Sequence, residues 1–245
     1  MPSAMRGRSV LTEWGMGGIE SLKDRVSVLV IVDVLSFSTA VDVAVARGAA
    51  ILPFPYGDGH DAVTAAERAG AVLARPRKAA GGQFSLSPAS LGTIAAGASL
   101  MLPSPNGSRL SLACGDKSVL TGCLRNAAAV AKVARSMAGD GAIGVIPAGE
   151  RWSDGSLRPA IEDLLGAGAI VHHLALPCSP EAEVACAAYR SARDDLGRLI
   201  RASVSGRELI ESGFASDVDI ALEIGVSQCV PLLREGAYRA ANGSG

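Results

Sequence analysis

The sequence is short of aromatic residues, of charges and of long apolar runs, and each shortage excludes a class of protein. Aromatic residues make up 4% of the 245 positions and charged residues 19%, with a formal net charge of -1. So small a charge argues against broad nucleic-acid binding, which needs a basic face. No apolar run approaches the roughly 20 residues that span a membrane, and positions 1–18 lack the apolar stretch of a secretory signal. We expect a cytoplasmic protein that binds neither nucleic acid nor membrane.

Motifs of the common nucleotide-binding and serine-hydrolase classes are missing as well. The chain has no Gly-x-x-x-x-Gly-Lys-Ser/Thr loop, no Gly-x-Ser-x-Gly elbow and no Gly-x-Gly-x-x-Gly after its first strand. His60, His172 and His173 have no partners at metal-ligand spacing, so no transition-metal site is expected. The five cysteines are scattered without a Cys-x-x-Cys pair, which favours buried thiols over disulfides or zinc ligands.

Small and aliphatic residues dominate what is present, and their order predicts an α/β fold. Apolar residues make up 49% of the chain, which rules out intrinsic disorder. Apolar runs alternate with helical segments, as in parallel strands joined by crossover helices. Strands are expected at 26–34, 49–54, 70–74, 99–103, 117–121 and 141–147, and helices at 38–47, 59–69, 88–96, 108–113, 126–138 and 159–170.

Beyond Pro177 the alternation ends and the chain becomes mainly helical. Ser179 is a favourable N-cap, followed by Pro180, for a long helix that should run to about residue 203. Shorter elements are expected at 206–211 and 216–224, before 228–231 and a soft tail at 240–245. We predict one α/β domain over 1–245, a three-layer sandwich with a mostly parallel sheet and a helical C-terminal part. A subdomain division near 175–180 is an alternative.

The first strand end that could carry chemistry includes Asp33, Ser36, Ser38 and Thr39. A carboxylate at the end of an apolar strand is costly to bury unless it is paired, hydrogen-bonded or bound to a metal. The three hydroxyl residues lie where a helix begins, and the free amides of a helix start bind anions. The simpler interpretation is that Asp33 accepts hydrogen bonds from its own turn and that Ser38 caps the helix.

The second strand end runs from Ser104 to Arg109, again between a strand and a helix. Asn106 and Gly107 supply an easily turned backbone, and Ser108 can cap the helix. Arg109 adds a planar cationic fork that suits phosphate or carboxylate. An ordinary turn with an N-cap is the alternative interpretation.

The third strand end begins at Ala148 and leads to Glu150, Arg158 and the pair Glu162 and Asp163. Two adjacent carboxylates one turn into a helix of Leu, Ala and Gly are unusual. The helix dipole is a sufficient reason for one of them. The other interpretation is that one carboxylate faces a hard cation such as Mg²⁺, which prefers one or two carboxylates together with water and substrate phosphate.

The three strand ends together indicate a site for a small anion. Each follows a strand of a sheet expected to be parallel, so all should emerge at one edge, where open α/β sheets bind ligands. They offer two anion-receptive helix starts, at least one arginine and up to three acids. Phosphate esters hydrolyse extremely slowly unless the transferring oxygens are neutralised and a nucleophile is positioned. The combination suits a metal-assisted phosphohydrolase.

At these same segments the chain resembles the 2-phosphosulfolactate phosphatase family. The matching stretches are 32–40, 46–49, 104–108, 148–149 and 161–169, with further matches at 87–88, 205–209, 213–214, 217–218 and 230–231. The resemblance implies the family's α/β architecture and a Mg²⁺-dependent removal of phosphate from 2-phospho-3-sulfolactate. It covers roughly residues 26 to 235.

Several positions depart from the family pattern. Ser36 stands where the family usually has Arg, and Ser205 where it usually has His. Leu86 and Ser90 replace an amide and an acid in the segment 85–90. Because a hydroxyl cannot replace a guanidinium aimed at an oxyanion without loss, these departures suggest a changed substrate or a lapsed catalyst.

We therefore expect a Mg²⁺-dependent phosphatase acting on a small anionic phosphate monoester. Metal and catalytic roles are expected for Asp33, Glu162 and Asp163. Phosphate binding is expected from the turn with Ser36, Ser38 and Thr39 and from Asn106, Gly107 and Ser108, and a second anionic group should meet Arg109 or Arg158. One alternative is a non-catalytic homologue that binds a small anion or a partner subunit. Another is an unrelated metal-dependent hydrolase or lyase on the same scaffold. The oligomeric state is left open, with a homodimer as one option.

Overall fold

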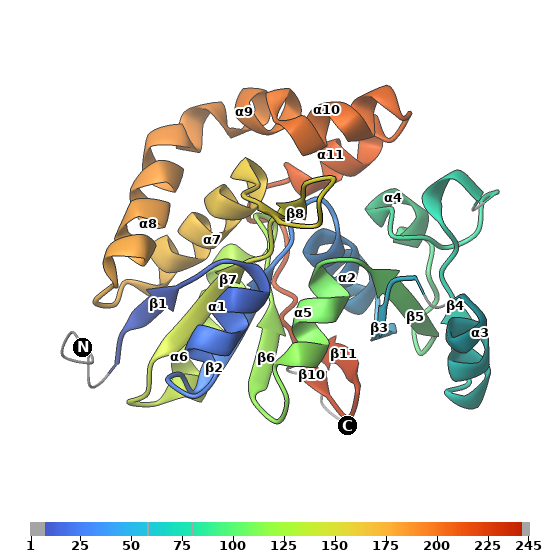
Figure 1. The fold of residues 1–245 in the computed structure, drawn as a ribbon, viewed down its shortest axis with the longest axis horizontal. Coiled ribbons are helices and arrows are strands. Elements are labelled where there is room, and N and C mark those ends of the chain that lie inside the picture. The colour runs from blue at the N-terminus through green and yellow to red at the C-terminus, as the bar shows by residue number, and fades with distance from the viewer. Residues whose placement is uncertain (1–7, 58, 80, 242–245) are drawn as a thin grey trace.

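The computed structural model describes residues 8–57, 59–79 and 81–241. The side chain of His60 and residues 242–245 of the expected tail lie outside this description. Within the described residues, nine strands form one large sheet (Figure 1). In spatial order they are β1 (Val10–Thr12), β7 (Ile143–Pro147), β2 (Val28–Val32), β6 (Ser118–Thr121), β10 (Pro231–Arg234), β11 (Ala237–Ala240), β3 (Ala50–Pro55), β5 (Ser99–Ser104) and β4 (Val72–Leu73).

Helices cover both faces of this sheet, which confirms the three-layer α/β architecture. Along β2, the alternate residues Val28, Val30 and Val32 pack in one apolar cluster with the helices α6 (Ala127–Ala138), α7 (Ile161–Leu174) and α8 (Pro180–Ala192). Leu29 and Ile31 pack in a second cluster with the helices α1 (Gly15–Leu22), α2 (Phe37–Ala46) and α5 (Gly107–Ala113). Because both faces are buried, β2 is an unbroken aliphatic run rather than an alternating one.

The sheet consists of two parallel blocks held apart by a C-terminal hairpin. One block is β1, β7, β2 and β6, and the other is β3, β5 and β4. The strands β10 and β11 lie between the blocks and pair antiparallel with each other and with both neighbours. Three successive antiparallel pairings reverse the second block. The expectation that all three polar strand ends share one edge of a single parallel sheet is therefore wrong.

Sheet twist explains why the strand ends of the two blocks still meet. Adjacent strands rotate by about 25°, and five steps separate β2 from β5 in the strand order. The accumulated rotation is on the order of 125°. Because the three antiparallel pairings reverse β5 relative to β2, the angle between the two strand directions is about 180° minus this rotation, or roughly 55°. The loops that follow β2 and β5 are joined by a hydrogen bond from the amide of Gly107 to the carboxylate of Asp33, with an N–O distance of 2.9 Å.

The helical C-terminal part forms an arc along one end of the sheet (Figure 1). Ser179 caps α8 as expected, since its hydroxyl accepts a hydrogen bond from the amide of Ala182. The single helix expected to run to about residue 203 is wrong, because the chain turns through the 3₁₀ segment η2 (Arg193–Asp195) into α9 (Leu196–Ala202). Two consecutive aspartates and Gly197 have low helix propensity at this point. The helices α10 (Val204–Glu211) and α11 (Ala215–Ala221) follow.

Several elements were not predicted or were predicted with other bounds. The strand β1, the helix α1 and the hairpin β10–β11 were missed, as was the small hairpin β8 (Glu150–Arg151) and β9 (Leu157–Arg158). The helix expected at 88–96 is the single turn α4 (Pro88–Leu91), which ends at Gly92. The irregular segment after β4 contains the 3₁₀ turn η1 (Arg77–Ala79), and α3 (Gly59–Arg68) lies before β4. Among the described residues, no helix is long and apolar enough to cross a membrane.

Close contact between α2 and α5 requires a glycine at the start of α5. A Cβ atom on Gly107 would lie 2.2–2.6 Å from three carbon atoms of Phe37, whose side chain is fully buried. Real Cβ atoms do not approach other carbons so closely, and the ring has no free space to enter. The position of the β5–α5 loop beside Asp33 therefore depends on this glycine.

We expect Gly107→Ala to lower the free energy of unfolding by about 1–3 kcal/mol, because the Phe37 ring or α5 must shift. Gly197→Ala in α9 is the matched control, since nothing lies within 4 Å of its added methyl group and alanine favours a helix over glycine by up to about 1 kcal/mol. Denaturant unfolding followed by circular dichroism compares the two variants. Equal effects would contradict the close packing of α2 and α5.

Candidate active site

Asp33 joins the loop after β2 to the loop after β5. Its Oδ1 atom accepts a hydrogen bond from the amide of Phe37 at 3.2 Å, within its own turn. Its Oδ2 atom accepts from the amide of Gly107 at 2.9 Å, across the molecule. The simpler interpretation of Asp33, in which it serves its own turn, is thus correct for one oxygen and insufficient for the other.

Asp163 joins the loop after β2 to the turn after β7. Its Oδ1 atom accepts from the amide of Val34 at 2.7 Å, and its Oδ2 atom accepts from the amide of Gly149 at 2.9 Å. The two buried aspartates together bring all three predicted strand ends into one place. That convergence was expected from the sequence, although the expected reason for it was not correct.

Four carboxyl groups gather where these loops meet. Asp33, Glu162 and Asp163 are 5%, 2% and 3% exposed, respectively. Glu150, the first residue of β8, lies among them, and its Oε2 atom accepts a hydrogen bond from Nδ2 of Asn106 at 2.8 Å. The charge of Glu162 acts on each of the other three carboxyl groups. We call these four residues the acidic cluster.

Burial and mutual repulsion raise the pKa values of three carboxyl groups, those of Asp33, Glu150 and Asp163. Burial raises the pKa of Asp33 to about 6, although hydrogen bonds from two backbone amides partly offset the shift. Burial, and then the charge of Asp33, raises the pKa of Glu150 to about 7. Burial, and then the charges of Asp33 and Glu162, raises the pKa of Asp163 well above its ordinary value. Simultaneous ionisation of these three carboxyl groups is thus unfavourable without a further cation.

Glu162 is the acid with the fewest partners. Its carboxylate receives no hydrogen bond from any described residue, yet the residue is almost completely buried. Its oxygens are not among the fully enclosed polar atoms that lack a partner, so they remain open to solvent or to a small cation. No group of three or more His, Cys, Asp or Glu side chains within the described ranges is placed to hold a metal ion. Mg²⁺ uses one or two carboxylates and keeps several waters, so the donor set fits that cation without such a group.

A guanidinium from η1 faces the acidic cluster. Nη2 of Arg77 donates to Oγ of Ser36 at 2.6 Å, and Nε donates to Oδ2 of Asp217 at 3.2 Å. Asp217 is fully buried in α11 and also accepts a hydrogen bond from the hydroxyl of Ser87. The charge of Arg77 lowers the pKa of Asp33. Arg77 is therefore held in place by Asp217 and lies close to Asp33.

The two arginines expected to meet a second anionic group lie in different surroundings. Arg158 is 9% exposed, its Nη2 atom donates to Oγ of Ser205 at 3.4 Å, and its charge lowers the pKa of Glu150. Arg109 is exposed and lines a separate hollow of about 380 Å³, in which Glu150 also lies. Arg158 thus borders the acidic cluster, whereas Arg109 shares a hollow with one member of it, Glu150.

Most of the hydroxyl groups expected to bind phosphate point into the interior. Ser38, Thr39 and Ser108 are 0% exposed, and each makes a short hydrogen bond to the backbone. Ser36 is 2% exposed and accepts its hydrogen bond from Arg77. These side chains shape the loops, and only Ser36 touches a charged group of the site.

Sequence reasoning missed the roles of Glu150, Arg77 and Asp217. Glu150 stood at the third strand end, and its position directly after a turn was a usable signal. Arg77 lies in a segment without periodicity, so only the missing arginine at position 36 suggested that another guanidinium was needed. Asp217 lies in the stretch 217–218 that matches the family, but no role was predicted for it, because an acid in the first turn of a short helix is ordinary.

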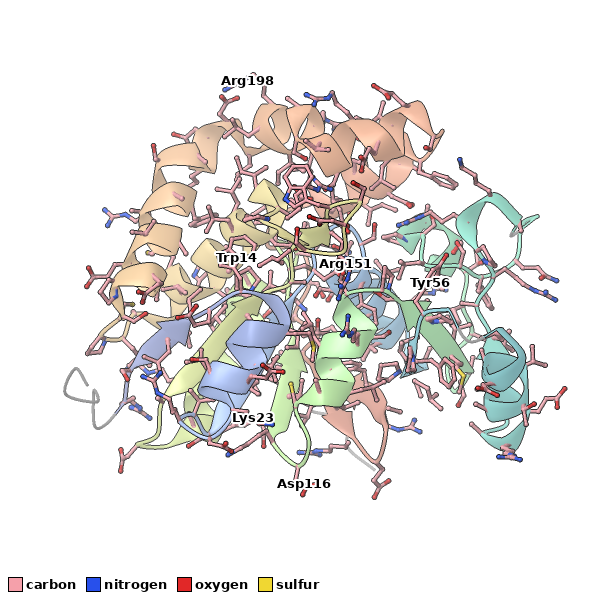
Figure 2. The ribbon with its side chains drawn as sticks, in the orientation of Figure 1. Trp14, Lys23, Tyr56, Asp116, Arg151 and Arg198 are labelled. Atoms are coloured by element: carbon pink, nitrogen blue, oxygen red, sulfur yellow. The ribbon has the colours of Figure 1, made fainter. Side chains whose placement is uncertain are left out.

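Three hollows surround the acidic cluster. The first, of about 620 Å³, contains Tyr56 and Arg77; the second, of about 380 Å³, contains Trp14 and Arg151; the third, of about 260 Å³, contains Arg77 and Glu150. Figure 2 labels Tyr56 of the first hollow and Trp14 and Arg151 of the second. A ligand at the cluster therefore has room to extend in more than one direction.

The fold and the site define an α/β protein that presents buried acids and a guanidinium at the carboxyl ends of its strands, where such folds bind ligands. The family model described as 2-phosphosulpholactate phosphatase matches residues 19–236, and the chain belongs to this family. It is 34% identical over 139 residues to the 2-phosphosulfolactate phosphatase of Methanothermobacter thermautotrophicus strain Delta H. That match covers 56% of this chain and 57% of the relative's length.

The raised pKa values predict how stability changes with pH. Asp33 and Glu150 bind their protons more tightly in the folded protein than in the unfolded chain, so between about pH 4 and pH 7 the folded state carries more protons. The free energy of unfolding of the metal-free protein therefore falls as the pH rises through this window. We expect the Tm to drop by about 2–6 °C between pH 5 and pH 8.

Glu150→Gln should remove much of this slope, because a neutral amide keeps the contact with Asn106 and has no proton to lose. Glu211→Gln, at an exposed position of α10, is the control and should leave the slope unchanged. Differential scanning calorimetry in the presence of a chelator measures the change of Tm with pH for the wild type and both variants. A Tm that rises with pH in all three proteins would contradict the assigned pKa shifts.

Proposed function

We propose that the protein is a Mg²⁺-dependent phosphatase that acts on a small phosphate monoester. The observation that carries this proposal is the acidic cluster, in which Glu162 is buried without a hydrogen-bond donor. Membership of the phosphatase family supports the reaction class, and the name of the relative supports a small phosphorylated acid as the substrate type. In the reaction the ester P–O bond breaks, water supplies an oxygen to phosphorus, and the leaving oxygen takes a proton.

Glu162 and Asp33 are the residues that would hold the cation. The carboxylate of Glu162 is free of other partners, and each oxygen of Asp33 accepts one amide and retains another lone pair. Mg²⁺ bound there supplies charge to neutralise phosphate oxygens and to activate water. Asp163 accepts two amides and serves to position the loops.

Glu150 is suited to move the proton. Its pKa of about 7 places it near the working pH, where a general acid or base is most effective. Because Nδ2 of Asn106 holds Oε2, the proton is carried on Oε1. In its protonated form Glu150 donates to the leaving oxygen, and in its ionised form it accepts a proton from water.

Arg77 supplies the guanidinium that binds phosphate. It contacts Ser36, the position where the family pattern has an arginine, so the charge enters the same place from another segment. Arg158 borders the cluster and is the better placed of the two predicted arginines for a second anionic group of the substrate. Arg109 is open to solvent and suits a group that extends past Glu150.

The non-catalytic alternative gains its support from the departures at Ser36, Leu86, Ser90 and Ser205. The contact of Arg77 with Ser36 weakens that support, because a guanidinium is then present at the position where the family pattern has an arginine. An unrelated lyase or hydrolase of another bond would consume substrate without releasing phosphate. Phosphate release, measured together with consumption of the substrate, therefore separates all three functions.

Phosphate release from a panel of small phosphorylated acids, with and without Mg²⁺, tests the proposal directly. We expect Mg²⁺-dependent release and a loss of at least about 100-fold in kcat/KM in Glu162→Gln, which exceeds the usual effect of a residue that only supports a ligand. Glu211→Gln should match the wild type. The Mg²⁺-induced rise in Tm should also disappear in Glu162→Gln. Binding of phosphate without turnover would favour the non-catalytic alternative.

Arg77→Lys tests the guanidinium separately from the cation. The lysine keeps the charge but loses the planar fork that contacts Ser36 and Asp217, so kcat/KM should fall by about 100-fold or more. Arg193→Lys, on the exposed 3₁₀ turn η2, is the matched control. The Mg²⁺-induced rise in Tm should stay intact in both variants. An unchanged kcat/KM in Arg77→Lys would show that the guanidinium of Arg77 does not bind the phosphate.

A further inference from the structure

The cavity of about 620 Å³ beside the acidic cluster is walled mainly by apolar side chains. It lies against β3, β4 and β5 and the segment that leads to α4. Its apolar walls include Tyr56, Leu73, Leu86, Pro103 and Pro105. Pro105 directly precedes Asn106, whose amide contacts Glu150, so this wall of the cavity adjoins the loop that borders the acidic cluster.

Arg77 forms the junction between this cavity and the acidic cluster. It lines the cavity, donates to Ser36 and lowers the pKa of Asp33. A phosphate group bound by Arg77 would therefore have the cluster on one side and the apolar walls on the other.

The cavity is too large for a short acid. About 620 Å³ corresponds to roughly 20 water molecules at about 30 Å³ each. A three-carbon acid would leave most of this volume open. Pockets of this size with mostly apolar walls and a few polar groups bind organic groups of considerable size.

The rim of the cavity is basic. Arg75 and Lys78 line it in addition to Arg77, and neither forms an ion pair with a described residue. An apolar interior with a cationic rim matches a molecule that has an anionic end and an apolar body.

We propose that the substrate is a phosphate monoester whose organic group is apolar, an alkyl or aryl group of more than three carbons, and that this group lies in the cavity. The inference rests on the proposed phosphatase function and narrows its substrate: the organic group enters the apolar cavity, and Arg158 and Arg109 then meet no second anionic group. Hydrolysis breaks the bond between phosphorus and the ester oxygen, water supplies the new oxygen on phosphorus, and the organic group leaves as the alcohol after taking a proton.

Alkyl phosphonates from ethyl to octyl test the cavity without turnover. Calorimetry with Mg²⁺ present should show the Kd falling about fourfold with each added methylene until the cavity is full. Release of phosphate from the matching alkyl phosphates is measured in parallel, and kcat/KM should follow the same trend.

Two variants locate the effect in the cavity. Leu73→Asn places an amide in the wall and should weaken octylphosphonate binding by about tenfold or more while ethylphosphonate binding stays the same. Tyr56→Ala, at a largely exposed position of the wall, gives a second reading without a risk to folding. Leu112→Asn is the control, since this exposed residue of α5 lines none of the three hollows.

The outcomes separate the two proposals. A Kd that does not change with chain length overturns the inference, and the phosphatase proposal then stands or falls on release from small phosphorylated acids. A Kd that falls with chain length, without phosphate release, supports the cavity assignment and overturns the phosphatase. An equal trend in Leu73→Asn, Tyr56→Ala and the wild type would also overturn the inference.

Discussion

Four backbone amides that point at two buried carboxylates hold the site together. Asp33 accepts from Phe37 and Gly107, and Asp163 accepts from Val34 and Gly149. These bonds place loops from distant parts of the chain within hydrogen-bond distance of one another. Loss of either carboxylate would leave two amides unpaired in a nearly dry environment, at about 1–3 kcal/mol each. The loops are thus fixed by the same acids that give the site its charge.

This arrangement concentrates more negative charge than the protein itself neutralises. Four carboxyl groups interact at the cluster, while Arg77 and Arg158 are the guanidiniums that lower the pKa values of its members. Natural proteins keep such imbalances where a ligand supplies the missing charge. Two neighbouring acids therefore differ in their contacts. Asp163 accepts hydrogen bonds from two backbone amides and fixes the loops, whereas Glu162 accepts none from a described residue.

The sequence predicted the architecture and the three loops because both are local properties. Aliphatic runs such as Val28–Val32 are buried on both faces, and that pattern is visible in the residues themselves. The hairpin of β10 and β11 was missed because its place depends on strands more than a hundred residues away. The same holds for Arg77, whose neighbours Ser36 and Asp217 come from opposite ends of the chain. The interior direction of Ser38, Thr39 and Ser108 could not be inferred either, since a helix start can turn a hydroxyl inward or outward.

The position of β10 and β11 has a consequence for how the chain assembles. These strands are the last of the described elements to be synthesised, yet they fill the middle of the sheet, between β6 and β3. Until they emerge from the ribosome, each parallel block exposes an unpaired edge, and such edges invite association between chains. Completion of the sheet therefore waits until residues 231–240 have been synthesised, and a nascent chain that stops short of residue 231 is left as two half-sheets, each with an unpaired edge.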